Sequence, residues 1–434
     1  MRQSGPGKVR DMALTEKEVR RHKRFARIVK PIIAPFIKLI FNYRFEPIKD
    51  VEGPMIVVAN HNCDLDPVMV GLACPQMYFV ASEHIFRKPA IAWLLETFLA
   101  PIARRKGSVD ASTVMEIRSR IKDGHSIAIF PEGNRSLDGR TGLIHPTTGK
   151  LIKAFGATLV TYHLEGGFFT TPRWGFGIRK GKMTGRPVGV YPREELKKMK
   201  PEEILELVRR DLYEDPYITQ EKERVRFRSK APARGLETAL YLCPHCKSIG
   251  TLHSTKREII CTCGYCAEFD EYGYFVKREV VQDGKELVFK TYTEWYLWQQ
   301  EEIAKLYAAY RDRKRAVQLD AQQTGSLSLD EFCVFPNNEV CLYEVGDDER
   351  SKPVMSGVMK ISTDGLSIVS ADGVRKEFPF KDIPEISLCG RNKLAFICDG
   401  GYYEVKTHKL FNSRLVIRLY ELINEKSVNV LPES

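Results

Sequence analysis

The stretch Met55-Ile-Val-Val-Ala-Asn-His-Asn-Cys-Asp-Leu-Asp66 joins an apolar run to a histidine and a carboxylate. The run Met55–Ala59 is short and mostly β-branched, which predicts a buried strand. His61 then lies where the strand ends, and ligands of open α/β sheets bind beyond the carboxyl ends of strands. A histidine with Asp66 close enough to orient it is the minimal arrangement for a general base.

The same residues also allow a purely structural interpretation. Asp66 and Pro67 fit the start of a helix, with Asp66 as the N-cap and Pro67 as the first helical residue. On that interpretation His61 is an ordinary loop residue. The two roles are compatible, because a cap residue can also hold an imidazole.

A second apolar run, Ser126-Ile-Ala-Ile-Phe130, predicts another short strand and continues into Pro131-Glu-Gly-Asn-Arg-Ser136. Gly133 lets the backbone approach a ligand closely. Arg135 offers a rigid fork that suits a phosphate, and Glu132 can accept a hydrogen bond from a hydroxyl or fix Arg135. Taken alone, this loop equally fits a turn with a surface ion pair.

Together the two loops resemble the glycerolipid acyltransferase family, whose best-known members are the lysophosphatidate acyltransferases. Asn60, His61 and Asp66 match its Asn-His-x4-Asp motif. Residues 130–136 match its Phe-Pro-Glu-Gly-Thr-Arg-Ser motif, with Asn134 in place of Thr. The resemblance covers roughly residues 40–200 and implies an α/β acyltransferase domain, a mixed sheet flanked by helices, over residues 46–235.

The resemblance implies direct acyl transfer without a serine nucleophile. His61 would take the proton of an acceptor hydroxyl, and Asp66 would hold the imidazole and stabilise the imidazolium. The hydroxyl oxygen would attack the thioester of acyl-CoA or of an acyl carrier protein. The implied acceptor is 1-acyl-glycerol-3-phosphate, giving phosphatidate, with glycerol-3-phosphate or another lysophospholipid as the alternative.

A phosphate-binding group follows from the same resemblance. The family places an arginine between its two strong motifs, where this chain has Leu99-Ala-Pro-Ile-Ala-Arg-Arg105. Two arginines compete there, and Arg105 is favoured over Arg104. The expected substrate phosphate-binding residues are therefore Arg105, Glu132, Gly133 and Arg135.

Two further segments keep alternative interpretations. Cys63, inside the first motif, suggests a thiol acyl-enzyme, but an activated cysteine needs its own base. The loop Gly166–Gly175 is rich in glycine and aromatic residues, so it fits either the lining of an acyl site or a packed loop.

The net charge of +11 is concentrated at the N-terminus. Residues 1–50 contain 13 Lys or Arg against 5 Asp or Glu, a net charge of +8. Apolar residues recur there at helical spacing opposite a basic face, which predicts membrane-surface helices over residues 1–45 that bind anionic lipids. Pro31 and Pro35 should kink or split the helix. A helix packed on the domain is the alternative, and a nucleic-acid partner is not expected, since stacking aromatics are missing.

Cysteines cluster in the second half of the chain, at Cys243-Pro-His-Cys246 and Cys261-Thr-Cys263-Gly-Tyr-Cys266. Two cysteine pairs on adjoining hairpins are typical of a zinc ribbon, predicted over residues 236–278. Gly264 directly after Cys263 favours Cys243, Cys246, Cys261 and Cys263 as ligands of a structural Zn²⁺. Cys266 is the substitute ligand, and free thiols without metal are the alternative.

A helical connector is predicted over residues 279–323, and residues 324–434 change to short alternating strands with a terminal helix. This mostly β domain resembles the pleckstrin-homology-like fold. The chain as a whole is predicted to be a cytoplasmic enzyme, peripheral on the inner face of the membrane, without a signal peptide or membrane span. The alternative is a non-catalytic lipid-binding scaffold.

Overall fold

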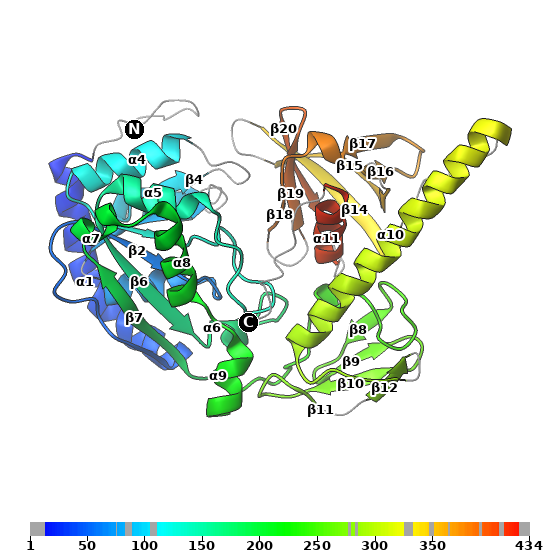
Figure 1. Cartoon of the computed structure of the whole chain (residues 1–434), viewed down its shortest axis with the longest axis horizontal. Coiled ribbons are helices and arrows are strands. Elements are labelled where there is room, and N and C mark those ends of the chain that lie inside the picture. The colour runs from blue at the N-terminus through cyan, green and yellow to red at the C-terminus, as the bar shows by residue number, and fades with distance from the viewer. Residues whose placement is uncertain are drawn as a thin grey trace. The chain divides into compact units, whose positions relative to one another are not determined.

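The structure, a computed structural model, divides into two compact units, Met1–Ser229 and Lys230–Ser434 (Figure 1). It describes residues 14–74, 76–82, 89–104, 111–276, 279–282, 285–324, 333–346, 351–362, 365–389, 393–407 and 412–424. Each unit has hydrophobic clusters of its own.

A seven-stranded mixed sheet forms the centre of the first unit, in the order β1-β7-β6-β2-β5-β3-β4. Its strands are β1 (Tyr43–Phe45), β2 (Met55–Ala59), β3 (Tyr78–Ser82), β4 (Ile102–Arg104), β5 (Ile127–Ile129), β6 (Thr158–Glu165) and β7 (Met183–Tyr191). The pairs β2–β5 and β2–β6 are parallel, whereas β6–β7 is antiparallel. The predicted mixed α/β sheet is confirmed.

Helices flank both faces of this sheet. They are α1 (Glu16–Phe41), α2 (Asp66–Ala73), α3 (Pro89–Phe98), α4 (Ala111–Lys122), α5 (Thr147–Phe155), α6 (Gly167–Thr170), α7 (Arg193–Lys198), α8 (Pro201–Leu212) and α9 (Pro216–Glu223). β2 shows why both faces need cover, because all five of its residues are buried. Ile56 and Val58 pack with α4, α5 and α8, while Val57 packs on the opposite side with α1 and α2.

The register of β2 and β5 brings the two sequence motifs together. Val58 pairs with Ile129 in the parallel ladder, so both strands end at the same edge of the sheet. The loops that begin at Asn60 and Phe130 therefore start side by side, which is the place where open α/β sheets bind ligands.

α1 is a single helix that contains both Pro31 and Pro35, so of the two predicted effects, a kink or a split, the split is wrong. Both prolines are exposed, where water can satisfy the carbonyls they leave free. The helix packs on the unit through Ile37 and Phe41. Its second half nevertheless exposes an apolar face, with exposed fractions of 51% for Ile28, 57% for Ile32, 60% for Phe36 and 66% for Leu39. Among the described residues, none of the helices has the length and apolar character to cross a bilayer.

The second unit begins with small sheets and a long helix. Its early elements are η2 (Leu236–Thr238), β8 (Leu252–Ser254), β9 (Glu258–Cys261), β10 (Cys266–Phe269), β11 (Phe275–Val276), β12 (Glu279–Gln282), β13 (Lys285–Val288) and α10 (Tyr292–Thr324). β8 to β11 form one antiparallel sheet, and β12 pairs antiparallel with β13. The helical connector predicted from residue 279 is therefore wrong at its start, because the helix begins only at Tyr292. Trp295 of α10 is fully buried, and its indole N–H donates to the Leu242 carbonyl at 3.1 Å.

A seven-stranded antiparallel sheet and a terminal helix complete this unit, so the predicted C-terminal β domain is present. The elements are β14 (Cys333–Val345), β15 (Ser351–Ile361), β16 (Gly365–Val369), β17 (Arg375–Pro379), η3 (Phe380–Asp382), β18 (Ile386–Leu388), β19 (Lys393–Cys398), β20 (Gly401–Lys406) and α11 (Ser413–Ile423). The strand order is β17-β16-β15-β14-β20-β19-β18. Leu415 and Leu419 of α11 join the core of this sheet, together with Ile303 of α10.

Candidate active site and cysteine cluster

His61 and Asp66 are in direct contact at the carboxyl end of β2. His61 Nδ1 lies 2.9 Å from Asp66 Oδ2. The Asp66 side chain is fully buried, whereas that of His61 is 21% exposed. The same Asp66 oxygen accepts the backbone N–H groups of Asn62 and Cys63, each at 2.7 Å. The carboxylate thus shapes the whole loop and leaves His61 Nε2 as the ring nitrogen that can meet a substrate.

The predicted capping role of Asp66 is wrong. Leu65 is the N-cap of α2, it makes no side-chain cap bond, and Asp66 is already the first helical residue. The Asp66 carboxylate turns back to the preceding loop instead of capping its own helix. Its position in the first turn still suits the positive end of the helix dipole.

Asn60 joins two strands of the sheet. Its side-chain amide donates to the Leu164 carbonyl and its side-chain oxygen accepts the Leu164 N–H, both at 2.8 Å. Asn60 is fully buried. It therefore fixes the end of β2 against β6 and positions the adjacent His61.

Glu132 joins the two motif loops through backbone groups. Its Oε1 accepts the N–H of His61 and its Oε2 accepts the N–H of Gly142, each at 2.7 Å. Burial raises the pKa of Glu132 to about 8, and these two hydrogen bonds oppose that rise. A second link is the N–H of Ser136, which donates to the His61 carbonyl at 2.8 Å. Glu132 thus holds the backbone of His61 in place.

Arg135 forms an ion pair that the sequence did not indicate. Its Nη1 lies 2.8 Å from Asp64 Oδ2, with side chains 11% and 81% exposed respectively. Asp64 belongs to the first motif loop, so a positive and a negative group stand together beside His61. Gly133 has the left-handed φ of +70° that permits this turn.

The loop after β6 packs against the motif loops. Phe168, Phe169 and Trp174 are buried. A Cβ atom added to Gly167 would lie only 3.2 Å from Asn62 Cβ, so a larger residue would push this segment away. Arg173 Nη1 donates to the Arg135 carbonyl at 2.7 Å, a contact that sequence reasoning missed. Of the two interpretations of this loop, the packed one describes these residues.

Cys63 is fully buried, and burial raises the pKa of its thiol to about 12. Such a group is protonated at neutral pH, and a thiol is a poor nucleophile compared with its thiolate. The geometry therefore disfavours an acyl-enzyme on Cys63. Of the two arginines considered as phosphate ligands, Arg104 is the last residue of β4, and Arg105 lies outside the described residues.

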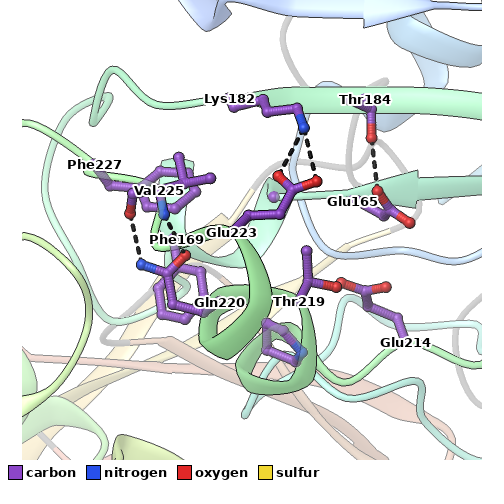
Figure 2. Close-up of a pocket in the computed structure, with 12 residues that line it drawn as sticks. Glu165, Phe169, Lys182, Thr184, Glu214, Thr219, Gln220, Glu223, Val225 and Phe227 are labelled. Carbon is purple, nitrogen blue, oxygen red and sulfur yellow. Dashed lines mark hydrogen bonds and ion pairs between the residues drawn. The ribbon is translucent and has the colours of Figure 1, made fainter.

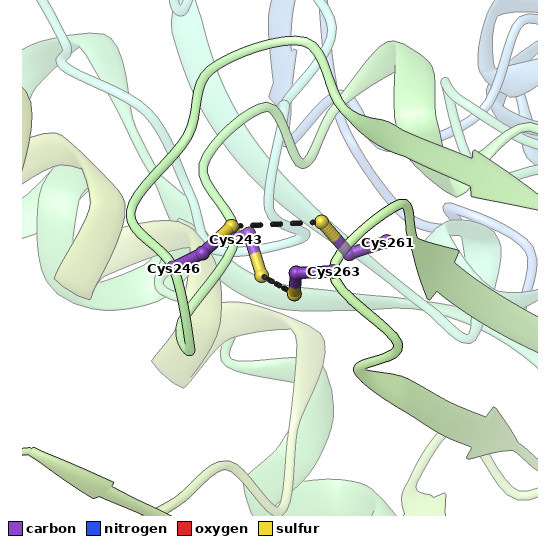
Figure 3. A group of neighbouring side chains, drawn as sticks. All are labelled: Cys243, Cys246, Cys261 and Cys263. Atoms are coloured by element: carbon purple, nitrogen blue, oxygen red, sulfur yellow. Dashed lines mark hydrogen bonds between the residues drawn. The ribbon is translucent and has the colours of Figure 1, made fainter.

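Four cysteine thiols meet in the second unit (Figure 3). Cys243 Sγ lies 3.8 Å from Cys263 Sγ, and Cys246 Sγ lies 3.7 Å from Cys261 Sγ. These separations are too long for disulfides. They fit a tetrahedral zinc site, since Zn–S bonds of about 2.3 Å place sulfur atoms about 3.8 Å apart.

In both cysteine turns of this cluster, a residue with left-handed backbone follows the second cysteine. Lys247 after Cys246 and Gly264 after Cys263 have left-handed φ values of +53° and +93°. Each donates its N–H to the carbonyl of the first cysteine of its pair at 3.0 Å. Cys266 is not in the cluster, and its Sγ contacts Glu258 Oε1 at 3.5 Å.

Comparison with known proteins places the likeness in the first unit, where residues 40–165 match the Acyltransferase family model. The chain is similar to a lyso-ornithine lipid O-acyltransferase of Rhodobacter capsulatus, with 31% identity over 121 residues, 28% of this chain and 42% of the relative. It is also similar to a chloroplastic 1-acyl-sn-glycerol-3-phosphate acyltransferase of Brassica napus, with 31% identity over 112 residues, 25% of this chain and 32% of the relative. The chain thus spans less than half the length of these curated relatives.

Among solved structures, the chain is similar to the 1-acyl-sn-glycerophosphate acyltransferase of Thermotoga maritima. The TM-score is 0.39 with 18% sequence identity, over 46% of this chain and 83% of that chain.

Proposed function

We propose that this protein transfers an acyl chain from acyl-CoA or an acyl carrier protein to a hydroxyl of a lysophospholipid. The contact between His61 and Asp66 is the observation that carries the proposal. A buried carboxylate orients an imidazole whose second nitrogen remains available, next to an arginine suited to an anionic headgroup. The match of residues 40–165 to the Acyltransferase family model supports the same reaction.

In the proposed step, His61 Nε2 takes the proton of the acceptor hydroxyl while that oxygen attacks the thioester carbonyl. Collapse of the tetrahedral intermediate breaks the C–S bond, and the imidazolium returns its proton to the thiolate. The products are an ester and a free thiol. Asp66 stabilises the imidazolium between the two proton transfers.

The proposed acceptor is 1-acyl-glycerol-3-phosphate, which would give phosphatidate. Arg135 would bind the phosphate, with Gly133 allowing close approach and Glu132 fixing the loop. Arg105 is retained as a proposed phosphate ligand on sequence grounds. The Asp64–Arg135 ion pair favours a second candidate, an acceptor with a zwitterionic headgroup whose anion meets Arg135 and whose ammonium meets Asp64.

We further propose that the protein acts as a peripheral enzyme on the inner face of a membrane. The exposed apolar residues of α1 support this location, because they lie beside a basic face formed by Arg20, Lys23, Arg24 and Arg27. An apolar stripe flanked by basic residues suits the boundary between headgroups and acyl chains. Each basic residue near an anionic leaflet contributes about 1 kcal/mol.

The four-cysteine cluster would hold a structural Zn²⁺ in this proposal. Four thiolates complete the tetrahedral coordination and leave no position for a substrate, so the ion would stabilise the second unit without taking part in catalysis. The C-terminal sheet with α11 is proposed to be pleckstrin-homology-like, with a lipid headgroup or a carrier protein as its partner.

The test of the proposed function is acyl transfer by the purified full chain. A panel of glycerol-3-phosphate, 1-acyl-glycerol-3-phosphate and zwitterionic lysolipids is offered with acyl-CoA or an acyl carrier protein, and products are identified by mass spectrometry. We expect turnover with 1-acyl-glycerol-3-phosphate or a zwitterionic lysolipid. No turnover with any acceptor and donor would favour the lipid-binding scaffold.

A further inference from the structure

Three groups of metal-ligand type meet in the first unit, and the proposed acyl transfer uses none of them. His163 and Glu165 are alternate residues of β6, so they share one face of the sheet, and Glu214 comes from the segment between α8 and α9. His163 Nε2 lies 2.9 Å from Glu214 Oε2, and His163 Nδ1 lies 3.5 Å from Glu165 Oε1. One ligand atom from each residue lies within 4.8 Å of the others.

Glu214 is a buried carboxylate with one oxygen that has no partner among the described residues. Its side chain is 3% exposed, and its Oε1 is buried without a hydrogen-bond partner among the described residues. Glu214 Oε2 pairs with His163 Nε2 at 2.9 Å, so Oε1 is the carboxylate oxygen that is left without a partner. A buried oxygen without a partner is costly, and a dication bound to it would remove that cost.

A small pocket borders the two carboxylates, with Phe169 and Phe227 among its walls (Figure 2). Thr184 Oγ1 donates to Glu165 Oε2 at 2.8 Å, which orients the carboxylate and directs Oε1 toward His163. Outer hydrogen bonds of this kind commonly orient metal ligands.

Two cations lie near these carboxylates and must be considered as competitors for them. Lys182 is already paired with Glu223, at 2.6 Å and 2.8 Å to its two oxygens. Arg186 Nη2 reaches Glu165 Oε1 only at 4.0 Å and is half exposed. Neither of these two contacts involves the buried Glu214, whose Oε2 pairs with His163 and whose Oε1 stays without a partner.

We propose that His163, Glu165 and Glu214 form a binding site for a divalent transition-metal ion such as Zn²⁺ or Mn²⁺. One imidazole and two carboxylates suit such ions. Metal–ligand bonds of about 2.0–2.2 Å require ligand atoms no more than about 4.4 Å apart. Small side-chain shifts from the observed spacing would therefore close the site.

Occupation of the site would brace the loop that holds His61. The backbone of Glu214 exchanges hydrogen bonds with Thr141, whose neighbour Gly142 donates to Glu132. Glu132 in turn accepts the N–H of His61. The metal is thus placed as a positioning element, and its binding does not depend on the proposed acyl transfer being correct.

The test uses Mn²⁺ as a probe, because Mn²⁺ prefers oxygen and nitrogen ligands over the cysteine thiolates. The full chain is titrated with Mn²⁺, and the signal of free Mn²⁺ is followed by electron paramagnetic resonance. We expect one bound equivalent per chain, and at least tenfold weaker binding after Glu214→Gln. Glu223→Gln, which changes a carboxylate of the same pocket outside the cluster, should bind as the unchanged chain does.

Glu165→Gln provides a second variant should the buried Glu214 position not tolerate change, because Glu165 is 26% exposed. It should also weaken Mn²⁺ binding at least tenfold, and Mn²⁺ or Zn²⁺ should raise the melting temperature of the unchanged chain. Absence of a bound Mn²⁺ equivalent in the unchanged chain, or Mn²⁺ binding by both Gln variants of the cluster as tight as that of the unchanged chain, would overturn the proposal. Acyl transfer is measured separately, so failure of the metal site and failure of the proposed function remain distinguishable.

Discussion

Asp66 Oδ2 receives three donors within 2.9 Å, namely His61 Nδ1 and two backbone N–H groups of the intervening loop. One buried oxygen therefore fixes both the shape of the loop and the direction of the imidazole. This dual role explains why the five-residue spacing between the histidine and the aspartate matters. Asp66 begins α2, and its carboxylate must reach back to the loop that precedes this helix.

Replacing Asp66 by Asn should lower kcat by about 10²- to 10⁴-fold, the usual range for positioned acid–base catalysis. The neutral Asn oxygen can still accept the three donors, but it lacks the negative charge that stabilises the imidazolium formed in the proton transfer. The measurement is kcat at saturating donor and acceptor. Asp123→Asn, an exposed carboxylate just after α4, is the matched control. An unchanged kcat in Asp66→Asn would contradict the orienting role.

Removing the Asp64 carboxylate should change acceptor preference. Asp64→Ala frees Arg135 from its ion pair, so KM for 1-acyl-glycerol-3-phosphate should fall about threefold or more at low salt, and less at high salt because exposed charges are screened. An acceptor with an ammonium group should instead show a higher KM. Arg135→Lys, which keeps the charge but loses the planar fork, should raise KM for the phosphate acceptor. If KM stays the same for both kinds of acceptor, the ion pair plays no part in recognition.

Removing one thiol of the cysteine cluster should release zinc. Cys243→Ser breaks the tetrahedral set, so we expect the loss of about one zinc per chain and a lower melting temperature of the second unit. Thiolate-to-cobalt charge-transfer absorption in the cobalt-substituted protein reports this site specifically. Cys266→Ser should keep both zinc and absorption, since its sulfur lies outside the cluster. A metal-free chain that is folded as purified would show that these thiols do not form a zinc site.

Charges placed on the exposed face of α1 should weaken membrane binding. The double change Ile32→Asp and Phe36→Asp removes two apolar side chains that are more than half exposed, and we expect at least tenfold less binding to anionic liposomes in a sedimentation assay. Leu306→Asp alters an exposed apolar residue of α10, which is 39% exposed and lies outside the C-terminal sheet, and it should bind normally. Equal sedimentation of all three proteins would mean that this face does not meet lipid.

Local chemistry explains what the sequence could predict. The strand Met55–Ala59 is β2, and the run 126–130 contains β5, because short β-branched apolar runs between polar loops favour buried strands. The four cysteines meet because two short turns present them. In each case the informative residues are neighbours in the chain.

What the sequence could not predict depends on contacts between distant segments. The pairing of Asp64 with Arg135, and of His163 with Glu214, appears only when strands and loops far apart in the chain are packed together. The helical spacing of apolar residues in α1 marks one side that includes Ile33, Ile37 and Ile40. Packing covers Ile37, whereas Ile33 and Ile40 stay exposed together with Ile32 and Phe36. Helical periodicity predicts which side of a helix is apolar, but it does not predict which segment of the protein packs against that side.

The most direct test of His61 as the general base is single-turnover acyl transfer by the unchanged chain and by His61→Ala, with circular dichroism to verify that both are folded. We expect ester formation by the unchanged chain and a rate lower by about 10³-fold or more in His61→Ala. Equal rates in the two folded proteins would contradict the assignment of His61 as the general base.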